Sequence, residues 1–551
     1  MTLEDLVIIG YLPEELLPVF TTEDLKPLLP DIIRDLDRFN PLKGGDIKKK
    51  VSKCVTFSIP KASGYRRTLS IPNPLHYIRL SNTIVNHWAD ISRHTESSIV
   101  SGSRLNNGGV RAIEKPNFEE FINQRIIRAV GNRYLLKIDI SRFYNSIYTH
   151  SIPWALHTKS VSKSIRTRVG LFGNALDEDC RRMQDGQTMG IPVGPDTSRV
   201  ISEVILAAID KMLIEQLPGF KGIRIIDDYY LYFTSLADVE IARALIHKIL
   251  KEYELELNPS KDAVSMIPEM LESQWYTELK IIRFSNIKSA QRKELISFFD
   301  RAAFYAKKHP EDSVISYAIS KVRNFAIHKD NLIILQSLLL NSILLESKAI
   351  ALLTEILISY HKNSYTLELV AIKHALQEFI KFHCDLNNEY EIFWALWAMK
   401  NLALKVDRSV ADKLTLSRNP IVILVVLHLR NSRFISKRID VSEWEALLTK
   451  DNLYNEYWLV AYEAKLRGWL TTADDYLETD PFFKFLKDKR VHFYKPRKTL
   501  SASRAAVFAR EPSMARHEDA YDLIFSNIIR SRVRPTTSQI LPDSTGFDLE
   551  F

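Results

Sequence analysis

The spacing of apolar residues divides the chain into two regions. From about residue 50 to residue 285, short runs of β type alternate with helical runs, which predicts mixed α/β structure. After about residue 290, the runs become longer, have helical apolar spacing and are joined by brief polar links. The clearest are Leu332–Glu346, Ala349–Tyr360, Leu367–His383 and Glu391–Val406. We therefore expect an all-helical second region of stacked helix pairs, although no fixed-period repeat is visible.

Both ends of the chain differ from these two regions. Residues 1–40 predict short amphipathic helices broken by Pro13, Pro18, Pro27 and Pro30. The polar, proline-containing far end predicts a flexible tail. We therefore divide the chain into a helical segment at 1–45, an α/β domain at 46–285, an all-helical domain at 286–530 and a tail at 531–551.

Composition fits a globular protein and excludes several other classes. Hydrophobic residues make up 46% of the 551 residues, and no apolar run reaches the ~20 residues of a membrane helix. Glu4 and Asp5 stand where a secretory signal carries basic residues, so we expect a soluble cytoplasmic protein with no membrane partner. The three cysteines lie far apart and have no zinc-ligand spacing.

Positive charge is concentrated in one part of the chain. The net charge is +8, and residues 41–170 contain 22 Lys and Arg against 7 Asp and Glu, so this part carries +15 and the remainder −7. Such a block indicates a surface for a polyanion such as nucleic acid. An ordinary solvated face explains the charge equally well when it is considered alone.

Three aspartates in the α/β region suggest a cation site. Asp139 lies near the end of the strand-like run Tyr134–Ile140, and Asp227 and Asp228 join two further strand-like runs as a hairpin. Adjacent carboxylates repel each other unless a cation lies between them. Magnesium prefers such oxygen ligands, and two metals about 4 Å apart can catalyse phosphoryl transfer. A plain polar turn is the alternative reading.

The elements around these aspartates predict a defined topology. After Ser198, apolar residues recur with the spacing of one helix face, and Asp196 or Thr197 is expected to cap that helix. Residues 223–226 and 229–233 form the hairpin, and Leu236–Tyr253 forms a second helix. The order strand, helix, hairpin, helix, strand is that of a split βαβ unit.

Four segments, in this order and spacing, resemble the palm motifs of reverse transcriptases. They are DISRFYNSI from Asp139, MGIPVGPDTSR from Met189, RIIDD from Arg224 and LNPSK from Leu257. The resemblance implies a right-hand polymerase with α/β fingers and palm, followed by a large, helical-repeat-like C-terminal domain. It also implies that Asp139, Asp227 and Asp228 hold two Mg²⁺ ions, and that Lys261 protonates the leaving pyrophosphate.

The same resemblance assigns the nucleotide-binding residues. The segment IPKASGYRRTLSIP from Ile59 looks like the fingers hairpin of the family, which makes Lys61 and Arg67 the cations that hold the triphosphate. Gly194 and Ser198 belong to the loop and helix that hold template and incoming nucleotide in the family. The glycines there would let the backbone approach a ligand closely.

Tyr144 bears on the choice between DNA and RNA. In reverse transcriptases, an aromatic residue five positions after the first aspartate lies under the sugar and blocks a 2′-hydroxyl. Tyr144 has that register with Asp139, so the resemblance implies dNTPs as substrates and DNA as product. The alternative is an aromatic side chain packed in the core.

Three positions depart from viral and retron reverse transcriptases. Val193, Ile225 and Arg199 replace a glutamine, a tyrosine and a proline that commonly contact template, primer or neighbouring structure. This form looks most like the AbiK-like, "unknown group" reverse transcriptases of bacterial abortive infection. That group implies antiphage defence, homo-oligomers, and DNA synthesis that needs no template and starts on a protein tyrosine. RNA-directed DNA synthesis on an added template stays open.

A protein-primed reaction needs a tyrosine that reaches the aspartates. Tyr11, in the turn Gly10–Pro13, is the candidate. Two other function classes also stay open. One is a non-catalytic nucleic-acid-binding scaffold in antiphage defence. The other is a helical toxin module with a regulatory polymerase half, because Arg323 to His328 resembles the Arg/His motif of HEPN-type ribonucleases.

Overall fold

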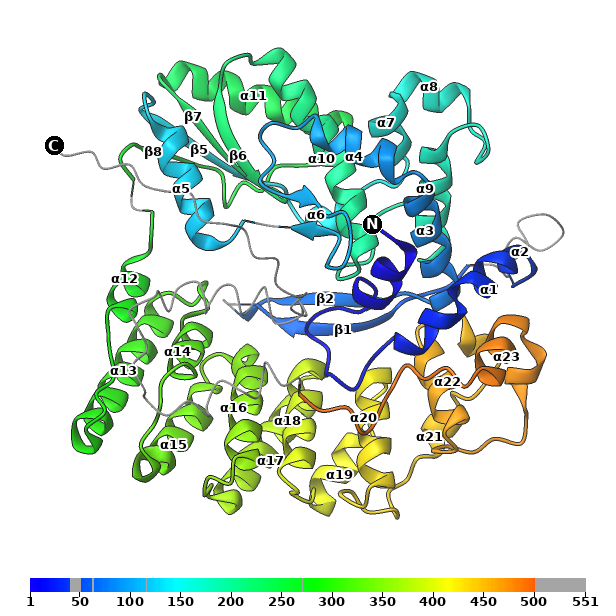
Figure 1. The fold of residues 1–551 in the computed structure, drawn as a ribbon, viewed down its shortest axis with the longest axis vertical. Coiled ribbons are helices and arrows are strands. Elements are labelled where there is room, and N and C mark those ends of the chain that lie inside the picture. The colour runs from blue at the N-terminus through cyan, green and yellow to red at the C-terminus, as the bar shows by residue number, and fades with distance from the viewer. Residues whose placement is uncertain (40–50, 62–63, 115, 270, 501–551) are drawn as a thin grey trace, which may run out of the picture.

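The computed structural model describes residues 1–39, 51–61, 64–114, 116–269 and 271–500 (Figure 1). The predicted tail at 531–551 and the domain limits near 45 and 530 lie outside these ranges. Figure 1 shows an α/β region at the top, a two-stranded hairpin across the middle and a row of helices below. The predicted fold class, α/β fingers and palm followed by an all-helical region, is confirmed.

A four-stranded sheet forms the centre of the α/β region. Its order is β6-β7-β5-β8, and every neighbouring pair is antiparallel. The strands are β5 (Tyr134–Asp139), β6 (Lys221–Ile225), β7 (Asp228–Phe233) and β8 (Ala263–Met266). The two long helices are α10 (Asp196–Gln216) and α11 (Leu236–Glu252). The chain order is thus strand, helix, hairpin, helix, strand, which confirms the predicted split βαβ topology.

The two faces of this sheet differ in composition. Leu136, Ile138 and Leu231 are fully buried on the face toward α11, which contacts β5 and β7. Alternate residues of the same strands, Asp139 and Asp228 among them, therefore lie on the opposite face. The sheet thus buries one face as core and presents carboxylates on the other.

Shorter elements complete the first 270 residues. They are η1 (Asp5–Ile9), η2 (Glu23–Leu28), α1 (Leu29–Arg34), α2 (Leu36–Phe39), α3 (Pro74–Asn86), α4 (Trp88–Glu96), β3 (Arg104–Leu105), β4 (Ile113–Glu114), α5 (Phe118–Ala129), α6 (Phe143–Ser146), α7 (Ser151–His157), α8 (Lys159–Ser164) and α9 (Phe172–Arg182). The prediction that prolines break the N-terminal helices is wrong for two of them. Pro27 lies inside η2, and Pro30 stands in the first turn of α1, where no N–H hydrogen bond is lost.

The middle hairpin consists of β1 (Val55–Pro60) and β2 (Arg66–Ile71), paired from Val55↔Ile71 to Pro60↔Arg66. The hairpin lies between the helical row and the α/β region (Figure 1). The hairpin expected from Ile59 to Pro72 is therefore present, and its tip carries Lys61.

The chain from residue 271 to residue 500 forms a row of helices. They are α12 (Gln274–Lys280), α13 (Lys288–Lys308), α14 (Val314–Val322), α15 (Leu332–Ser342), α16 (Ile350–Lys362), α17 (Leu369–Asp385), α18 (Glu389–Asn401), α19 (Arg408–Leu414), α20 (Pro420–Asn431), α21 (Ser442–Glu445), α22 (Trp458–Leu466) and α23 (Pro481–Asp488). Short 3₁₀ turns join some of them: η5 (Lys329–Asn331), η6 (Ser347–Ala349), η7 (Asp451–Leu453) and η8 (Tyr476–Thr479).

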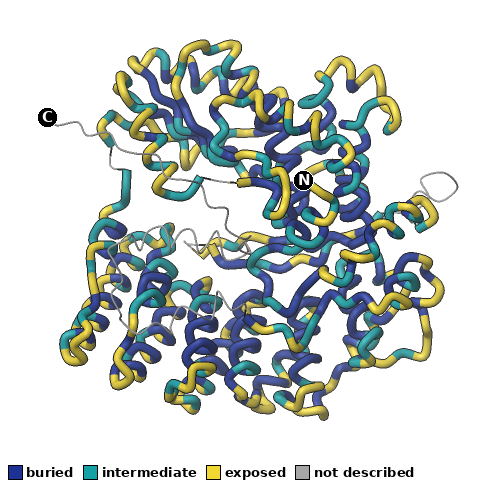
Figure 2. The backbone as a smooth tube through the Cα atoms, in the orientation of Figure 1, coloured by how far each residue is buried: buried dark blue, intermediate teal, exposed yellow. Residues whose placement is uncertain are grey.

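These helices stack in two layers. α14, α16, α18, α20 and α22 contact one another in succession, whereas α13 contacts α15 and α17 contacts α19. Every residue from 390 to 399 in α18 and from 420 to 429 in α20 is buried, as the dark blue segments of Figure 2 show. Helices that are apolar all round need cover on all sides. Here the outer helices cover one side, and β1 contacts α18 on the other.

Carboxylates of α18 anchor the hairpin to the helical row. The fully buried Glu391 accepts two hydrogen bonds from the Arg66 guanidinium, both at 2.8 Å. Glu389 accepts from the Ser58 amide at 3.0 Å and from its hydroxyl at 2.6 Å. Bidentate arginine–carboxylate pairs fix orientation as well as distance. The helical row therefore determines where the hairpin lies.

The N-terminal segment is held by both parts of the molecule. Trp394 in α18 donates from its indole nitrogen to the Glu15 carbonyl at 3.0 Å, and Phe20 forms a β-bridge with Tyr494. On its other side, the amide of Asp196 donates to the Gly10 carbonyl at 2.8 Å. None of the helices in the described ranges combines the length and apolarity that crossing a membrane requires.

Candidate active site

The three predicted aspartates lie at one end of the sheet, on its open face. Asp139 ends β5 and is directly opposite Asp228, the first residue of β7. Asp227 lies in the hairpin turn just before Asp228. The turn differs by one residue from the prediction, since Ile226 and Asp227 form it and Asp228 already pairs with Ile225. Directly opposite side chains on one face are about 5 Å apart at Cβ, so these carboxylates face each other.

The hairpin turn is strained and is held from within the protein. Ile226 has φ +53°, a left-handed conformation that is costly for a β-branched residue. Its carbonyl accepts a hydrogen bond from the Arg224 guanidinium at 2.9 Å. Arg224 is fully buried and also contacts Glu203 and Asp210 of α10 at 2.6 and 2.7 Å. This network fixes the turn that carries Asp227.

Asp139 is the best-supported carboxylate of the three. It is 5% exposed, and its Oδ1 accepts from the Asn258 side-chain amide at 2.9 Å. Its Oδ2 pairs with the Lys261 ammonium at 2.5 Å. Burial alone would lower the pKa of Lys261, but the hydrogen bond and charge of Asp139 raise it instead. Lys261 therefore stays protonated at the site.

The other two carboxylates lack such compensation. Burial, followed by the charges of Asp227 and Asp139, raises the pKa of Asp228 to about 6. The pKa of Asp227 is also raised, first by burial and then by Asp139. Excess negative charge held out of water favours either protons or cations at that position. Three carboxylates on one sheet end are a donor set that fits Mg²⁺.

The hairpin from the middle of the molecule brings two cations to these carboxylates. The pKa of Lys61 is lowered first by burial and then by the charges of Arg67 and Lys261, whereas Asp227 and Asp139 act in the opposite direction. Arg67 in turn lowers the pKa of Asp227. The tip of the hairpin therefore lies within electrostatic range of the aspartates.

Tyr144, in the short helix α6, lies at the same site. Its hydroxyl accepts a hydrogen bond from Ser202 of α10 at 3.3 Å, and its ring is half-buried. Burial raises the pKa of Tyr144, and the charge of Asp227 adds to that rise. The backbone carbonyl of Tyr144 accepts from the Ile191 amide at 2.9 Å, which joins α6 to the glycine-bearing loop.

The glycine-bearing loop is covered by the protein's own chain. Gly194 has φ +120°, and a Cβ there would come within 2.8 Å of the Pro13 ring. The carbonyl of Val193 accepts from the Ser70 amide at 2.9 Å, and the Ser198 side chain is 2% exposed. The close approach expected at Gly194 is thus made by the N-terminal segment. Gly194 is half-buried beside Pro13, whereas Ser198 is buried in this structure.

The expected cap of α10 is wrong. The helix begins at Asp196, Pro195 occupies the N-cap position, and no side chain caps it. The Asp196 carboxylate instead accepts from the Ala112 amide at 2.7 Å and from Arg111 at 2.9 Å. Hydrogen bonds to both an arginine and a backbone amide stabilise a buried carboxylate more than capping a helix N-terminus would.

The geometry of Tyr11 does not fit a priming role. Tyr11 is fully buried, its ring stacks on Tyr77 at 4.1 Å between centroids, and its hydroxyl donates to the Pro72 carbonyl at 2.5 Å. Burial first, and then the charge of Tyr77, raise the pKa of Tyr11 well above its ordinary value. An initiating nucleophile must be exposed, so Tyr11 cannot act as one in this conformation.

The Arg/His motif of the helical region has local structural partners. Arg323 donates to Glu355 of α16 at 3.0 Å. His328 caps the turn η5 by accepting from the Asp330 amide. Each side chain is thus used to join or end helices, which favours the structural reading over a ribonuclease site.

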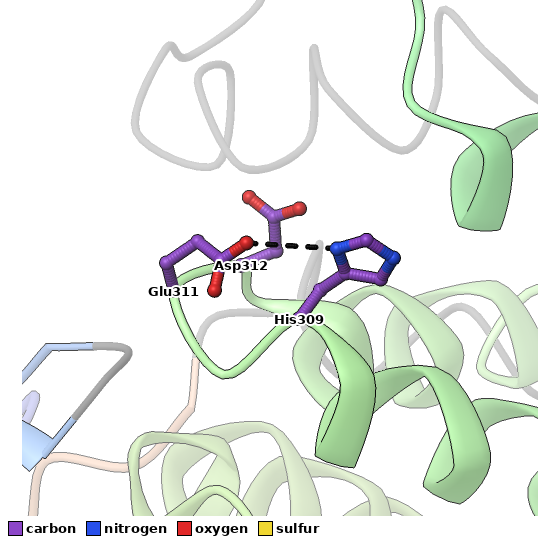
Figure 3. A group of neighbouring side chains, drawn as sticks. All are labelled: His309, Glu311 and Asp312. Atoms are coloured by element: carbon purple, nitrogen blue, oxygen red, sulfur yellow. Dashed lines mark ion pairs between the residues drawn. The ribbon is translucent and has the colours of Figure 1, made fainter. Parts of the chain in front are cut away.

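A separate group of metal-ligand type lies between α13 and α14 (Figure 3). His309, Glu311 and Asp312 are the one trio in the described ranges with ligand atoms all within 4.8 Å of one another. Asp312 already accepts from the Trp275 indole at 2.7 Å, and Glu311 is exposed beside the His309 ring. The three active-site aspartates are less tightly gathered, because they repel each other and Lys261 pairs with one oxygen of Asp139.

Sequence reasoning missed three residues at the site. Arg224 was quoted as part of the RIIDD motif, but no role was predicted for it. A charged residue inside an apolar strand is a signal of an internal ion pair. Asn258 stands in the LNPSK segment, and its amide orients Asp139. Lys137 lies two residues before Asp139 on β5, so both side chains lie on the same face of the sheet.

One protein family matches part of this chain. Residues 59–309 match the family described as reverse transcriptase (RNA-dependent DNA polymerase). No curated protein matches the chain. Among solved structures, the chain is similar to telomerase from Candida albicans in complex with a TWJ fragment of telomeric RNA, at 14% identity over 77% of this chain and 68% of that chain with a TM-score of 0.30. It is also similar to apo telomerase from Candida tropicalis, at 11% identity over 77% and 76% with a TM-score of 0.32.

The matched range contains every element that builds the site. It begins at the middle hairpin, includes β5 to β8 and ends in α13, so it extends beyond the limit of 285 expected for the α/β domain. All three aspartates, Lys61, Arg67, Tyr144 and Lys261 lie within it. Residues 59–309 are thus similar to the reverse transcriptase family, and their sheet presents three carboxylates.

Proposed function

We propose that this chain is a DNA polymerase that adds deoxynucleotides by metal-dependent phosphoryl transfer. The observation that carries the proposal is the pair Asp139 and Asp228, directly opposite each other beside Asp227 in a reverse transcriptase domain. The raised pKa values of Asp227 and Asp228, caused first by burial, indicate a site that gains from bound cations. Asp139, Asp227 and Asp228 would hold two Mg²⁺ ions, which would neutralise the charge that develops on the transferred phosphate.

The neighbouring side chains have distinct roles in this reaction. Lys61 and Arg67 bind the triphosphate from the hairpin side, Arg67 through its fork of donors and Lys61 as a point charge. Lys261, kept protonated by Asp139, gives a proton to the leaving pyrophosphate. Asn258 holds the Asp139 carboxylate in place. Positioning and charge neutralisation supply most of the rate.

Tyr144 sets the preference for deoxynucleotides. Its half-buried ring lies between α10 and the aspartates, where Ser202 holds its hydroxyl. A 2′-hydroxyl on the incoming sugar would meet this ring. We expect Tyr144→Ala to increase the use of rNTPs relative to dNTPs, whereas Tyr144→Phe keeps the wild-type preference.

We further propose that synthesis needs no added template and serves antiphage defence. Two observations support untemplated synthesis. Pro13 lies against Gly194, and the Ser70 amide donates to the Val193 carbonyl, so two points of the loop that holds template in the family are contacted by the protein's own chain. The defence role, protein priming on a tyrosine and homo-oligomerisation rest on the likeness to AbiK-like enzymes.

One experiment tests the main proposal. Purified protein is given one labelled dNTP or rNTP at a time with Mg²⁺ and no template, and products are separated on a denaturing gel before and after protease treatment. We expect incorporation of dNTPs, with label attached to protein until protease is added. Incorporation of rNTPs alone would contradict DNA synthesis, and a strict need for added template would contradict the untemplated reaction.

A non-catalytic scaffold remains the second candidate, because the reverse transcriptase domain is tightly joined to a helical row that offers its own surface. Asp227→Ala separates the two. A scaffold would keep its protective effect in a phage-challenge assay, whereas an enzyme would lose it. Arg323→Ala tests the toxin reading in the same assay, with Arg418→Ala as the control, because Arg418 forms an exposed ion pair with Glu443 on the same row.

A further inference from the structure

One basic residue next to the aspartates has no role in the reaction described above. Lys137 stands on β5 two positions before Asp139 and pairs across the sheet with Tyr230 of β7. Because residues two apart share a face, Lys137 and Tyr230 lie beside Asp139 and Asp228 on the open face of the sheet. β5 and β7 pair along the whole of β5, from Asp139↔Asp228 to Tyr134↔Phe233.

The contacts of Lys137 leave its charge available. Its ammonium lies 5.4 Å from the centre of the Tyr230 ring, and within the described ranges no carboxylate forms an ion pair with it. The guanidinium of Arg125 lies 4.9 Å from the same ring but pairs with Glu269. Tyr230 is therefore flanked by two cations, of which Lys137 is the one without an acidic partner.

The cations around the site lie on different elements. Lys61 follows β1 and Arg67 lies on β2, so both belong to the hairpin. Lys261 pairs directly with Asp139. Lys137 lies on β5, two residues before Asp139, and is therefore the cation placed along the strands of the sheet.

In phosphoryl transfer, the attacking and leaving oxygens lie roughly in line on opposite sides of the transferred phosphorus. If Lys61 and Arg67 hold the triphosphate, the leaving pyrophosphate lies on the hairpin side. The strand that brings the attacking hydroxyl must then approach from the other side, along β5 and β7. A strand of nucleic acid carries a phosphate on each nucleotide, and a lysine without a partner is suited to bind one.

We propose that Lys137 binds a phosphate of the DNA strand that is being extended, and that Tyr230 is a positioning residue that holds Lys137 toward that strand. This inference rests on the proposed polymerase function but goes beyond it, because it assigns the side from which the growing strand enters. The ligand is single-stranded DNA, recognised by its backbone and not by its bases.

The experiment measures strand binding and catalysis separately on the full-length protein. Binding of a labelled oligo-dT strand is followed by fluorescence anisotropy in EDTA, without nucleotides, at several salt concentrations. Steady-state extension of the same strand gives one KM for the strand and one for dTTP. The variants are Lys137→Gln, Lys137→Arg, Tyr230→Leu and Tyr230→Phe. Lys221→Gln is the matched control, since Lys221 lies on the same face at the far end of β6.

We expect Lys137→Gln to weaken strand binding about tenfold and to reduce the slope of log affinity against log salt by about one. The KM for dTTP should stay within about twofold. Lys137→Arg keeps the charge and Tyr230→Phe keeps the ring, so both variants should bind the strand as the wild type does. Tyr230→Leu should weaken strand binding as Lys137→Gln does. Lys221→Gln should match the wild type, and all variants should unfold at similar temperatures.

Several results would overturn the inference. One is unchanged strand binding in Lys137→Gln, and another is an equal rise in both KM values, which would place Lys137 at the triphosphate. Failure of wild-type protein to bind the strand at all would also overturn it. If wild-type protein binds the strand but adds no nucleotide, the polymerase proposal fails, while the anisotropy series still decides the role of Lys137.

Discussion

Two acidic clusters lie on opposite faces of the same β6–β7 hairpin. On the buried face, Glu203 and Asp210 of α10 share the Arg224 guanidinium, with contacts of 2.6 and 2.7 Å. On the open face, Asp139 and Asp228 lie opposite each other beside Asp227. The first cluster is closed by an arginine of its own strand. In the second, Lys261 forms an ion pair with one oxygen of Asp139.

The difference separates carboxylates that the protein neutralises itself from carboxylates that it leaves partly uncompensated. In the buried cluster, Ser98, Ser101 and Tyr229 supply further hydrogen bonds, so that its carboxylates are satisfied. In the open cluster, burial, followed by the charges of Asp227 and Asp139, raises the pKa of Asp228 to about 6. Carboxylates that the protein does not neutralise itself are suited to an external cation. The buried cluster in turn fixes the strained turn that carries Asp227.

The largest expected effect is on catalysis and comes from the open cluster. Asp227→Asn removes one metal ligand and one repelling charge, so we expect nucleotide incorporation to fall roughly 10³-fold or more. The free energy of unfolding measured in EDTA should stay equal or rise, because repulsion with Asp139 and Asp228 is relieved. Denaturant titration together with the single-nucleotide assay checks both. A fall in stability that accounts for the lost activity would contradict the assignment.

The buried cluster should respond in the opposite way. Arg224→Met leaves Glu203 and Asp210 buried without a counter-charge, so we expect a loss of about 3–5 kcal/mol in the free energy of unfolding. Arg93→Met, in an exposed i,i+3 pair with Asp90, is the control and should change stability by less than about 0.5 kcal/mol. Equal effects of the two substitutions would remove the distinction between the clusters.

His428 in α20 differs from both acidic clusters, because it is an ionisable group that is buried in its neutral form. Burial, followed by the charges of Lys400 and Arg467, lowers the pKa of His428 to about 4, and Tyr494 is its hydrogen-bond partner. Because the unfolded chain binds this proton near pH 6.5, stability is present above that pH and is lost as the pH falls toward 4. We expect a loss on the order of 2 kcal/mol between pH 7.5 and pH 5.

His428→Gln should remove that part of the pH dependence. Denaturant unfolding of both proteins at pH 7.5 and pH 5 gives the comparison. His361, near the exposed end of α16, serves as the control in a His361→Gln variant, which should keep the wild-type pH dependence. If the free energy of unfolding falls equally between pH 7.5 and pH 5 in the wild type and in His428→Gln, another group causes the pH dependence.

The smallest expected effect is the response of the folded protein to Mg²⁺. Binding to the open cluster should stabilise the wild type by about 1.4 kcal/mol at ten times the Kd, because the ion binds the folded state only. A thermal-shift titration measures this, with Asp227→Asn as the matched variant that should show little shift. A shift of equal size in Asp227→Asn would place the bound ion elsewhere, for example at His309, Glu311 and Asp312.

Local patterns along the chain determined much of the fold and of the site. Apolar spacing predicted the helical second region, and the order of strands, helices and hairpin predicted the palm sheet. Strand and turn patterns predicted that Asp139 and the Asp227–Asp228 turn belong to neighbouring strands, and the sheet pairs Asp139 with Asp228. Lys61 and Tyr144 were expected at the site only from the resemblance to reverse transcriptases. These features depend on contacts between residues that are near in sequence or paired in one sheet.

Tertiary structure decided what covers and supports that site. The contact of Pro13 with Gly194, the burial of Tyr11 and the capture of Arg66 by Glu391 join segments that are far apart in the chain. The spacing of apolar residues reports which face of an element is buried, but it does not report which distant segment buries it. The sequence thus determines which strands and turns carry the aspartates, whereas the contact of Pro13 with Gly194 and the anchored hairpin depend on how distant segments pack together.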